Sequence, residues 1–259
     1  MFKKTAVLVI FLITLSISLG CGKSTGETFI TYEEFKVIGN NEDGTAHFYI
    51  MYKNKRVFDF LGVYGDSLVE AQKMNAFKIS HLIKGSDGQL FYENRDGDDT
   101  NKTNYFMVFD LDRKKGTVKN ITPSCKEGIL ENKYLVKDVD EDGNQEILEI
   151  LSPFDSIRQD LDFKIPRSYL AFSYDKKRCK YIPAGKKCRK YLLKTSPQLF
   201  KENGDLYSVL MTALPFWSAC DSKSAWKIFD TNYQGADKEI MRGKIKMALS
   251  KVCFECADN

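Results

Sequence analysis

The chain has 259 residues and a formal net charge of +4, of which Lys3 and Lys4 contribute two charges. The rest of the chain therefore carries +2, far below the clustered positive charge of nucleic-acid-binding domains, and no nucleic-acid partner is expected. Hydrophobic residues make up 43% of the chain, enough for a packed core in one large or two small domains. The two histidines, His47 and His81, lie in strand-like runs, so a histidine base or a histidine-rich metal site is not expected.

Residues 1–20 have the pattern of an export signal. Two lysines precede an apolar run from Ala6 to Leu19, and small and polar residues follow from Gly20. An apolar run of about 14 residues is shorter than the ~20 residues that cross a bilayer, which argues against an uncleaved anchor. The mature chain is predicted to begin at Cys21, with residues 21–27 as a tether to the folded part.

The sequence Ser18-Leu19-Gly20-Cys21 resembles the end of a bacterial lipoprotein signal, with Leu19 one position later than in the usual motif. The resemblance implies that Cys21 carries a lipid such as palmitate and anchors an exported protein to a bacterial membrane. In a Gram-negative host this would be the outer membrane or the cell surface. The implied partners are the membrane, through this anchor, and an envelope protein. The alternatives are an ordinary cleaved signal, with Cys21 left as a thiol, and an uncleaved anchor.

Residues 28–184 are predicted to form a β-rich domain. Alternating, β-branched and aromatic runs recur between turn signals such as Asn40–Gly44 and Gly85–Gly88, which predicts antiparallel hairpins. The predicted strands are Phe29–Val37, Ala46–Tyr52, Arg56–Tyr64, Ala76–Ile83, Gln89–Tyr92, Tyr105–Leu111, Thr117–Ile121, Lys133–Val136, Glu146–Leu151, Tyr169–Tyr174 and Cys179–Ile182.

Two stretches of this domain look alike, Tyr105–Lys119 and Tyr169–Ile182. Each has an apolar strand, a turn of acidic and basic residues, and a second strand, and their period is about 64 residues. Two interpretations stay open. The stretches are either blade-like repeats of a partial propeller, or two unrelated hairpins of a meander that share one kind of turn.

The acidic segment that begins at Asp138 is the strongest candidate site. Carboxylates alternate at Asp138, Asp140 and Asp142, so a wrapped loop directs them towards one centre. Gly143 permits a sharp turn, and the carbonyl of Asn144 can add a ligand. Hard oxygen ligands in this number suit Ca²⁺. Without a cation, carboxylates packed this closely repel one another, which argues against a plain turn.

The segment matches the EF-hand pattern, with Glu149 as its twelfth residue, but its flanks have the pattern of strands. The stretch Tyr134–Leu151 resembles instead the strand–loop–strand calcium loop of FG-GAP/VCBS-type repeats. That resemblance implies a structural Ca²⁺ ion and a β-domain that is truncated or has borrowed the loop, since the chain is too short for seven blades. The ligands it implies are Asp138, Asp140, Asp142, the Asn144 carbonyl and Glu146.

From residue 185 to residue 259 the apolar residues have helical spacing. The predicted helices are Cys188–Leu193, Pro197–Cys220, Ser224–Asn232 and Ala236–Cys256. Six cysteines follow Cys21, and an even number in an exported chain favours disulfides, with fifteen possible connectivities. They are Cys125, Cys179, Cys188, Cys220, Cys253 and Cys256. The last two have CxxC spacing at the end of a helical pattern, which favours a structural bridge over a redox or zinc-binding pair.

The predicted fold class is α+β, with an N-terminal antiparallel β-rich domain followed by a C-terminal helical, cysteine-rich segment. No catalytic residue is assigned, because no nucleophile or nucleotide-binding motif is present. The expected function is that of a non-enzymatic, membrane-anchored envelope lipoprotein with a structural calcium site and a binding or scaffold role. The alternatives are a hydrolase of envelope polymers that uses a carboxylate pair, and a thiol-redox or metal-handling protein that uses Cys253 and Cys256.

Overall fold

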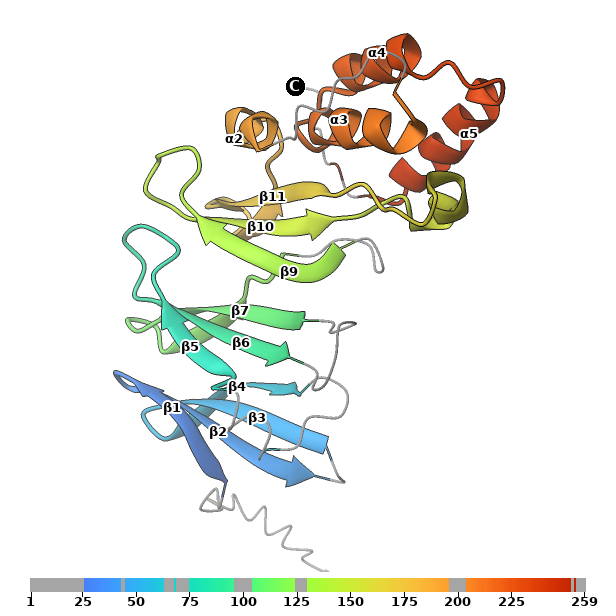
Figure 1. The fold of residues 1–259 in the computed structure, drawn as a ribbon. Helices are drawn as coiled ribbons and strands as arrows, with labels where there is room; N and C mark the ends of the chain where they lie inside the picture. Colours follow the sequence, from blue (N-terminus) through green and yellow to red (C-terminus); the bar gives the residue numbers. More distant parts are fainter. Residues whose placement is uncertain are drawn as a thin grey trace, which may run out of the picture.

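Three four-stranded antiparallel sheets, each built from consecutive strands, form the first part of the chain (Figure 1). The structure is a computed structural model and describes residues 26–42, 45–62, 68, 75–95, 104–123, 130–195, 204–252 and 254. The first sheet contains β1 (Glu27–Tyr32), β2 (Phe35–Glu42), β3 (Thr45–Tyr52) and β4 (Lys55–Leu61). The second contains β5 (Phe77–Ser80), β6 (Gln89–Arg95), β7 (Asn104–Asp112) and β8 (Thr117–Asn120). The third contains β9 (Leu130–Lys137), β10 (Glu146–Leu151), β11 (Ser168–Asp175) and β12 (Lys180–Pro183).

The second sheet is the middle layer of the stack, and it is buried on both faces. Along β6 the side chains alternate: Leu90 and Tyr92 pack in the core shared with the first sheet, while Phe91 packs in the core shared with the third. On the side of the first sheet, Phe48 and Ile50 of β3 complete that core. A strand buried on both faces is typically apolar at successive positions, as β6 is at Leu90, Phe91 and Tyr92.

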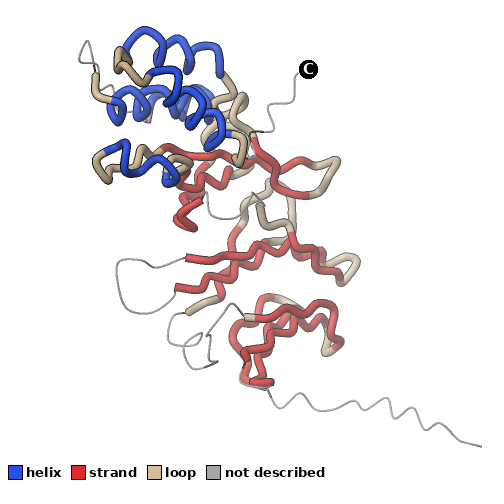
Figure 2. The backbone as a smooth tube through the Cα atoms, turned by 90° about the vertical axis from the view of Figure 1, so that its right-hand side faces the viewer, coloured by secondary structure: helices blue, strands red, loops and turns tan. Residues whose placement is uncertain are grey.

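The helices lie at one end of this stack, beyond the third sheet (Figure 2). They are η1 (Asp155–Leu161), a 3₁₀ helix, and α2 (Arg189–Lys194), α3 (Leu206–Ser218), α4 (Ser222–Asn232) and α5 (Lys238–Leu249). The buried helix α3 packs on β11. The side-chain carboxylates of Asp205 and Asp221 cap α3 and α4, where each accepts a hydrogen bond from a backbone amide. Within the described part of the chain, no helix combines the length and apolarity needed to cross a membrane.

The coarse fold prediction is confirmed: antiparallel sheets come first and helices follow. Two element predictions are wrong in detail. The stretch Phe29–Val37 is not one strand, because the chain reverses at Glu33, whose φ of 54° is left-handed, and splits it into β1 and β2. Two glutamates, Glu33 and Glu34, occupy the turn, and no glycine, proline or asparagine marks it in the sequence. The helix predicted for Pro197–Cys220 begins instead at Leu206, after its Asp205 cap.

The two similar stretches of sequence occupy the same place in consecutive sheets, as β7–β8 and β11–β12. The pairs Asp112–Thr117 and Asp175–Lys180 close turns of equal length. In both turns the last residue is left-handed, Gly116 with φ 63° and Cys179 with φ 47°. The opening aspartate accepts a backbone hydrogen bond from the residue three positions later in both. The two stretches therefore share their turn geometry as well as their sequence pattern.

Candidate metal centre

The acidic segment forms the loop between β9 and β10, residues 138–145, and the pair Lys137–Glu146 closes it. The flanking elements are therefore strands. The loop turns inward through two left-handed residues, Glu141 with φ 62° and Gly143 with φ 88°. At Gly143 this conformation is the one that glycine tolerates without strain. Its amide donates a hydrogen bond to Asp138 Oδ2 at 3.0 Å, which folds the chain around the first carboxylate.

Three of the five predicted ligands converge. One carboxylate oxygen from each of Asp138, Asp140 and Glu146 lies within 4.8 Å of the other two, and the three together could hold a metal ion. Glu146 is fully buried, and it accepts hydrogen bonds from the Val139 amide at 2.9 Å and from Ser173 Oγ on β11 at 3.2 Å. Asp138 Oδ1 is buried and has no hydrogen-bond partner in the described part of the chain.

A cation from the protein itself sits in this cluster. Lys187, just before α2, places its Nζ 2.5 Å from Asp140 Oδ2, 2.7 Å from Asp142 Oδ2 and 3.6 Å from Glu146 Oε1. The same ammonium donates to Ser173 Oγ at 2.9 Å. Partial burial alone lowers the pKa of Lys187, but hydrogen bonds to Asp140 and Asp142 and the charge of Glu146 raise it above its ordinary value. The carboxylates thus hold a positive charge at their centre.

The carboxylates respond differently to this environment. Burial raises the pKa of Glu146, and the neighbouring Asp140 charge raises it further. Burial acts the same way on Asp142, but hydrogen bonds from Lys187 and from Asn144 outweigh it and lower the pKa of Asp142. A carboxylate whose pKa is raised by burial and like charge gains most from a nearby cation.

Asp142 and Asn144 have other contacts. Asp142 Oδ1 accepts hydrogen bonds from the backbone amide and side-chain amide of Asn144, at 2.7 and 2.9 Å. Asn144 Oδ1 in turn accepts from the Lys84 amide at 3.0 Å, and the Gln145 amide donates to the Leu82 carbonyl at 2.7 Å. These bonds dock the loop on the second sheet. The Asp142 carboxylate therefore contacts the cluster through its ion pair with Lys187. The side chain of Asn144 holds the loop against the second sheet.

Sequence reasoning missed Lys187 and Ser173. Both are far from the loop along the chain, and they reach it only because β10 pairs with β11 and the segment before α2 folds back over the loop. No local pattern marks either residue. Glu149, the twelfth residue of the EF-hand pattern, lies instead within β10, 4% exposed, between Tyr134 on β9 and Leu170 on β11.

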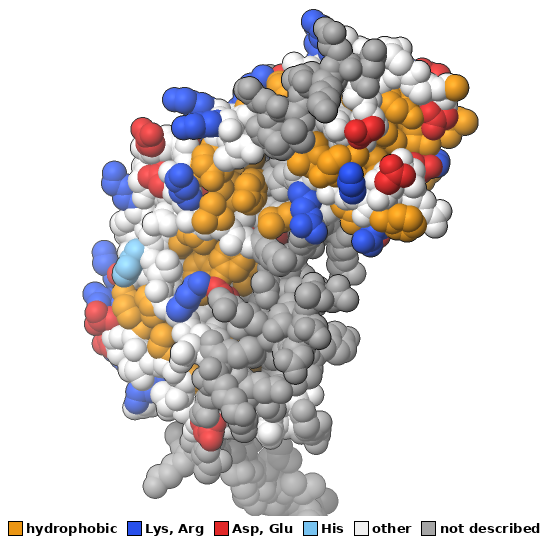
Figure 3. Space-filling view, viewed as in Figure 1, with side chains coloured by type: hydrophobic (Ala, Val, Ile, Leu, Met, Phe, Trp, Pro, Cys, Tyr) orange, Lys and Arg blue, Asp and Glu red, His pale blue; other side chains and the backbone are white. Residues whose placement is uncertain are grey.

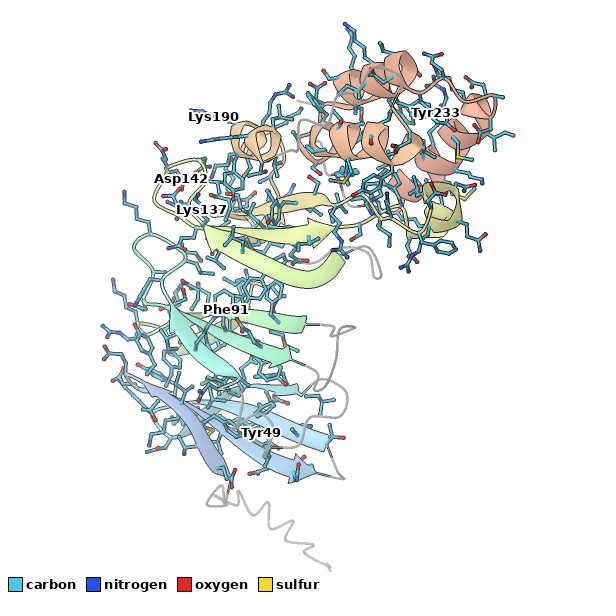
Figure 4. All side chains as sticks on the ribbon, in the orientation of Figure 1. Tyr49, Phe91, Lys137, Asp142, Lys190 and Tyr233 are labelled. Carbon is cyan, nitrogen blue, oxygen red and sulfur yellow. The ribbon has the colours of Figure 1, made fainter. Side chains whose placement is uncertain are left out.

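A cavity of about 440 Å³ adjoins the loop, and it is referred to below as the α2 cavity. Its walls come from β9, from the loop and from α2, and they include Lys137, Lys187, Lys190, Lys194 and Tyr191. Figure 4 shows Lys137, Asp142 and Lys190 at the same corner of the molecule. The carboxylates of the loop and the ammonium groups of α2 thus face one hollow.

Three of the predicted disulfide cysteines are described. Cys220 is disulfide-bonded, whereas Cys179 and Cys188 are free thiols. Cys188 lies at the wall of the α2 cavity, where burial, with the Glu146 charge, raises the pKa of its thiol to about 12. The other candidates, Cys125, Cys253 and Cys256, and the predicted lipidation site Cys21 lie outside the described residues.

The β9–β10 loop has a counterpart in the second sheet of the same chain. The β5–β6 loop of the second sheet, residues 81–88, has the same length as the β9–β10 loop. Gln89 stands where Glu146 stands, is also fully buried, and accepts a hydrogen bond from the Leu82 amide as Glu146 does from the Val139 amide. Compared with known proteins, the chain matches no family model, no curated protein and no solved structure.

Proposed function

We propose that this chain is a non-enzymatic, lipid-anchored protein of the bacterial envelope whose β9–β10 loop binds Ca²⁺. The observation that carries the calcium proposal is the position of Lys187. Asp140, Asp142 and Glu146 already hold one ammonium group, and beside them a buried oxygen of Asp138 has no partner in the described part of the chain. A divalent ion neutralises this charge more fully than one ammonium does, and carboxylate oxygens are the ligands that calcium prefers.

The internal repeat supports the same proposal. The β5–β6 loop has His81, Ile83 and Gly85 at the positions of Asp138, Asp140 and Asp142, and it still closes the hairpin. The carboxylates are therefore not needed to build a loop of this kind. Their presence in the third sheet calls for another reason, and a cation supplies it.

The burial of the cluster favours a structural ion over the hydrolase alternative. In glycoside hydrolases, two carboxyl groups about 5–10 Å apart flank an accessible bond. Here Glu146 is fully buried, and the three carboxylates lie within 4.8 Å of one another around a lysine. A substrate has no room between them.

Export is supported by the signal pattern and by the disulfide at Cys220, since disulfides persist outside the cytoplasm.

Thermal unfolding with added Ca²⁺ tests the ion. At a free concentration of 100 times Kd, a bound ion stabilises the folded state by about 2.7 kcal/mol, which raises Tm by roughly 5–10 °C in a domain of this size. Asp140→Asn should remove most of this rise, because it replaces a charged ligand at the centre of the cluster, the carboxylate closest to Lys187, with a neutral amide. Asp112→Asn, at an exposed turn of the second sheet, is the matched control and should leave the rise intact.

A second variant tests the competition with the internal ammonium. Lys187→Met should bind Ca²⁺ several-fold more tightly than the unaltered chain, because the ion no longer has to displace a charged group. Titration calorimetry measures the difference. An unaltered chain that shows no Tm rise in millimolar Ca²⁺, or a rise that survives Asp140→Asn, would contradict the calcium proposal.

The lipid anchor is tested separately. The mass of the N-terminal peptide of the protein made in bacteria should show an acylated Cys21, and Cys21→Ser should abolish both the added mass and the recovery of the protein with membranes. An unmodified Cys21 thiol in a processed chain would favour the ordinary secreted alternative.

A further inference from the structure

The α2 cavity collects ammonium groups from three places in the chain. Lys137 ends β9, Lys187 precedes α2, and Lys190 and Lys194 lie on α2, whose described sequence contains no acidic residue. All four line the same hollow. Figure 3 shows basic side chains over this corner of the molecule, with acidic side chains of the loop beside them.

Three of these lysines have no counter-ion among the described residues. Elsewhere basic side chains on the helices pair with carboxylates, as Arg189 does with Asp221 at 2.7 Å and Lys244 with Asp160 at 2.8 Å. Within the described ranges, by contrast, Lys137, Lys190 and Lys194 make no ion pair. Lys137 Nζ instead lies 5.0 Å from the ring centroid of Tyr191. Like charges that converge on one hollow repel one another, and an anion there would relieve the repulsion.

Occupation of the loop by Ca²⁺ would increase this positive charge. The acidic side chains that line the cavity are Asp138, Asp140 and Glu141, so the hollow is close to neutral while Lys187 holds the loop. A divalent ion adds two positive charges at the loop and displaces the Lys187 ammonium. The side chain of Lys187 is 41% exposed at the rim, and the open space next to it is the α2 cavity.

From this arrangement we propose that the α2 cavity binds a phosphate-bearing anion when Ca²⁺ occupies the β9–β10 loop. The inference rests on the calcium proposal above. Lysine binds phosphate as a point charge, and a calcium ion with open coordination positions binds phosphate oxygens directly. A cavity of about 440 Å³ accommodates a small phosphomonoester or the phosphodiester headgroup of a lipid. Lys190 and Lys194 hold the anion, and the displaced Lys187 joins them.

Titration calorimetry on the full chain in neutral detergent tests this coupling, with fructose 1,6-bisphosphate as the probe. The protein is stripped of metal by dialysis and measured without added metal and again in saturating Ca²⁺. The bisphosphate should bind at least tenfold more tightly with calcium. The double variant Lys190→Ala, Lys194→Ala should lose at least tenfold in affinity for the bisphosphate and should keep its affinity for Ca²⁺.

The matched control is Lys223→Ala, Lys227→Ala on α4, which removes two exposed lysines outside the cavity and should change neither affinity. Glycerophosphoglycerol, a soluble lipid headgroup diester, serves as a second probe. Tighter binding of the diester would identify a lipid headgroup as the source of the phosphate, and tighter binding of the bisphosphate would identify a soluble phosphomonoester; both support the shared chemistry.

Three results would overturn the inference. In the first, Ca²⁺ binds but neither probe does, which leaves the calcium site standing. In the second, the bisphosphate binds equally well with and without calcium, or equally well to the α2 double variant. In the third, Ca²⁺ itself does not bind, which overturns the calcium proposal together with this one.

Discussion

The second and third sheets build the same hairpin with different chemistry. In both, eight residues connect the first two strands, and a fully buried side chain at the start of the second strand anchors the loop. In the second sheet the anchor is Gln89, whose amide donates to Asp110 Oδ1 on β7 at 2.8 Å. In the third it is Glu146, which accepts from Ser173 on β11. The donor and acceptor are exchanged between the two sheets.

The comparison distinguishes the residues that close the hairpin from the residues that surround a cation. Either anchor closes the loop, because each satisfies the backbone amide of the loop's second residue, Leu82 or Val139. Only the third sheet surrounds its anchor with carboxylates and brings a lysine to them. The repeat therefore supplies the scaffold, and substitutions within the loop supply the charge.

The largest effect is expected from exchanging one anchor alone. Gln89→Glu would place a second carboxylate against Asp110 in a buried position, where burial already raises the pKa of Asp110. We expect a loss of about 3 kcal/mol in the free energy of unfolding, measured by urea denaturation. The double variant Gln89→Glu, Asp110→Ser rebuilds the Glu146–Ser173 arrangement and should recover most of that loss. Equal losses in the single and double variants would show that the two anchors are not equivalent.

The next largest effect on stability is expected at Glu149. This residue occupies the position in β10 that the buried Tyr92 occupies in β6. Burial raises the pKa of Glu149 from 4.5 to about 7. Because the folded state then binds a proton that the unfolded state releases, stability is greatest below pH 4.5 and falls as the pH rises to about 7, by at most about 1.4 kcal/mol per pH unit. Glu149→Gln should therefore be more stable than the unaltered chain at pH 8 by up to about 3 kcal/mol.

Tm measured from pH 5 to pH 8 checks this prediction, since the difference between the two chains should grow with pH. Glu141→Gln, in the exposed part of the same repeat, is the control and should show no such growth. A constant difference across the range would show that Glu149 is charged in the folded protein at all of these pH values.

The smallest effect concerns the turns that close the two similar stretches. Gly116 and Cys179 occupy the same left-handed position, but only glycine adopts it without strain. Cys179→Gly should stabilise the protein by up to about 1 kcal/mol, measured as a rise in Tm of a few degrees. Gly116→Ala, the reciprocal change, should destabilise it, because an added Cβ would also lie 2.5 Å from the ring of Tyr52. A loss of stability in Cys179→Gly would mean that the thiol makes contacts worth more than the strain.

The helices take the place of a further sheet. The outer face of the third sheet, with Leu148 and Ala171, packs against Leu192 of α2 and the buried Cys188. In the second sheet the corresponding face, with Phe91, packs against the third sheet. A fourth four-stranded sheet is not needed to bury this face, and the segment that leads into α2 brings Lys187 to the acidic loop.

Local patterns in the sequence were enough for the strands and the loop. Alternation placed eleven of the twelve strands, and the missing one reflects a turn at Glu33 that no glycine, proline or asparagine marks. The spacing of Asp138 and Asp140 identified a cluster that does converge. These features depend on side chains that are neighbours along the chain, so periodicity and spacing report them directly.

The tertiary structure decided the rest. That a lysine occupies the carboxylate cluster, that Ser173 holds Glu146, and that Gln89 is its counterpart all depend on strand pairing and on the path into α2. Contacts between residues distant in sequence follow from how layers pack, and no local pattern encodes them. The sequence by itself thus determined an acidic loop between two strands. Packing determined which cation lies beside that loop, because only packing brings Lys187, some forty residues further along the chain, into contact with its carboxylates.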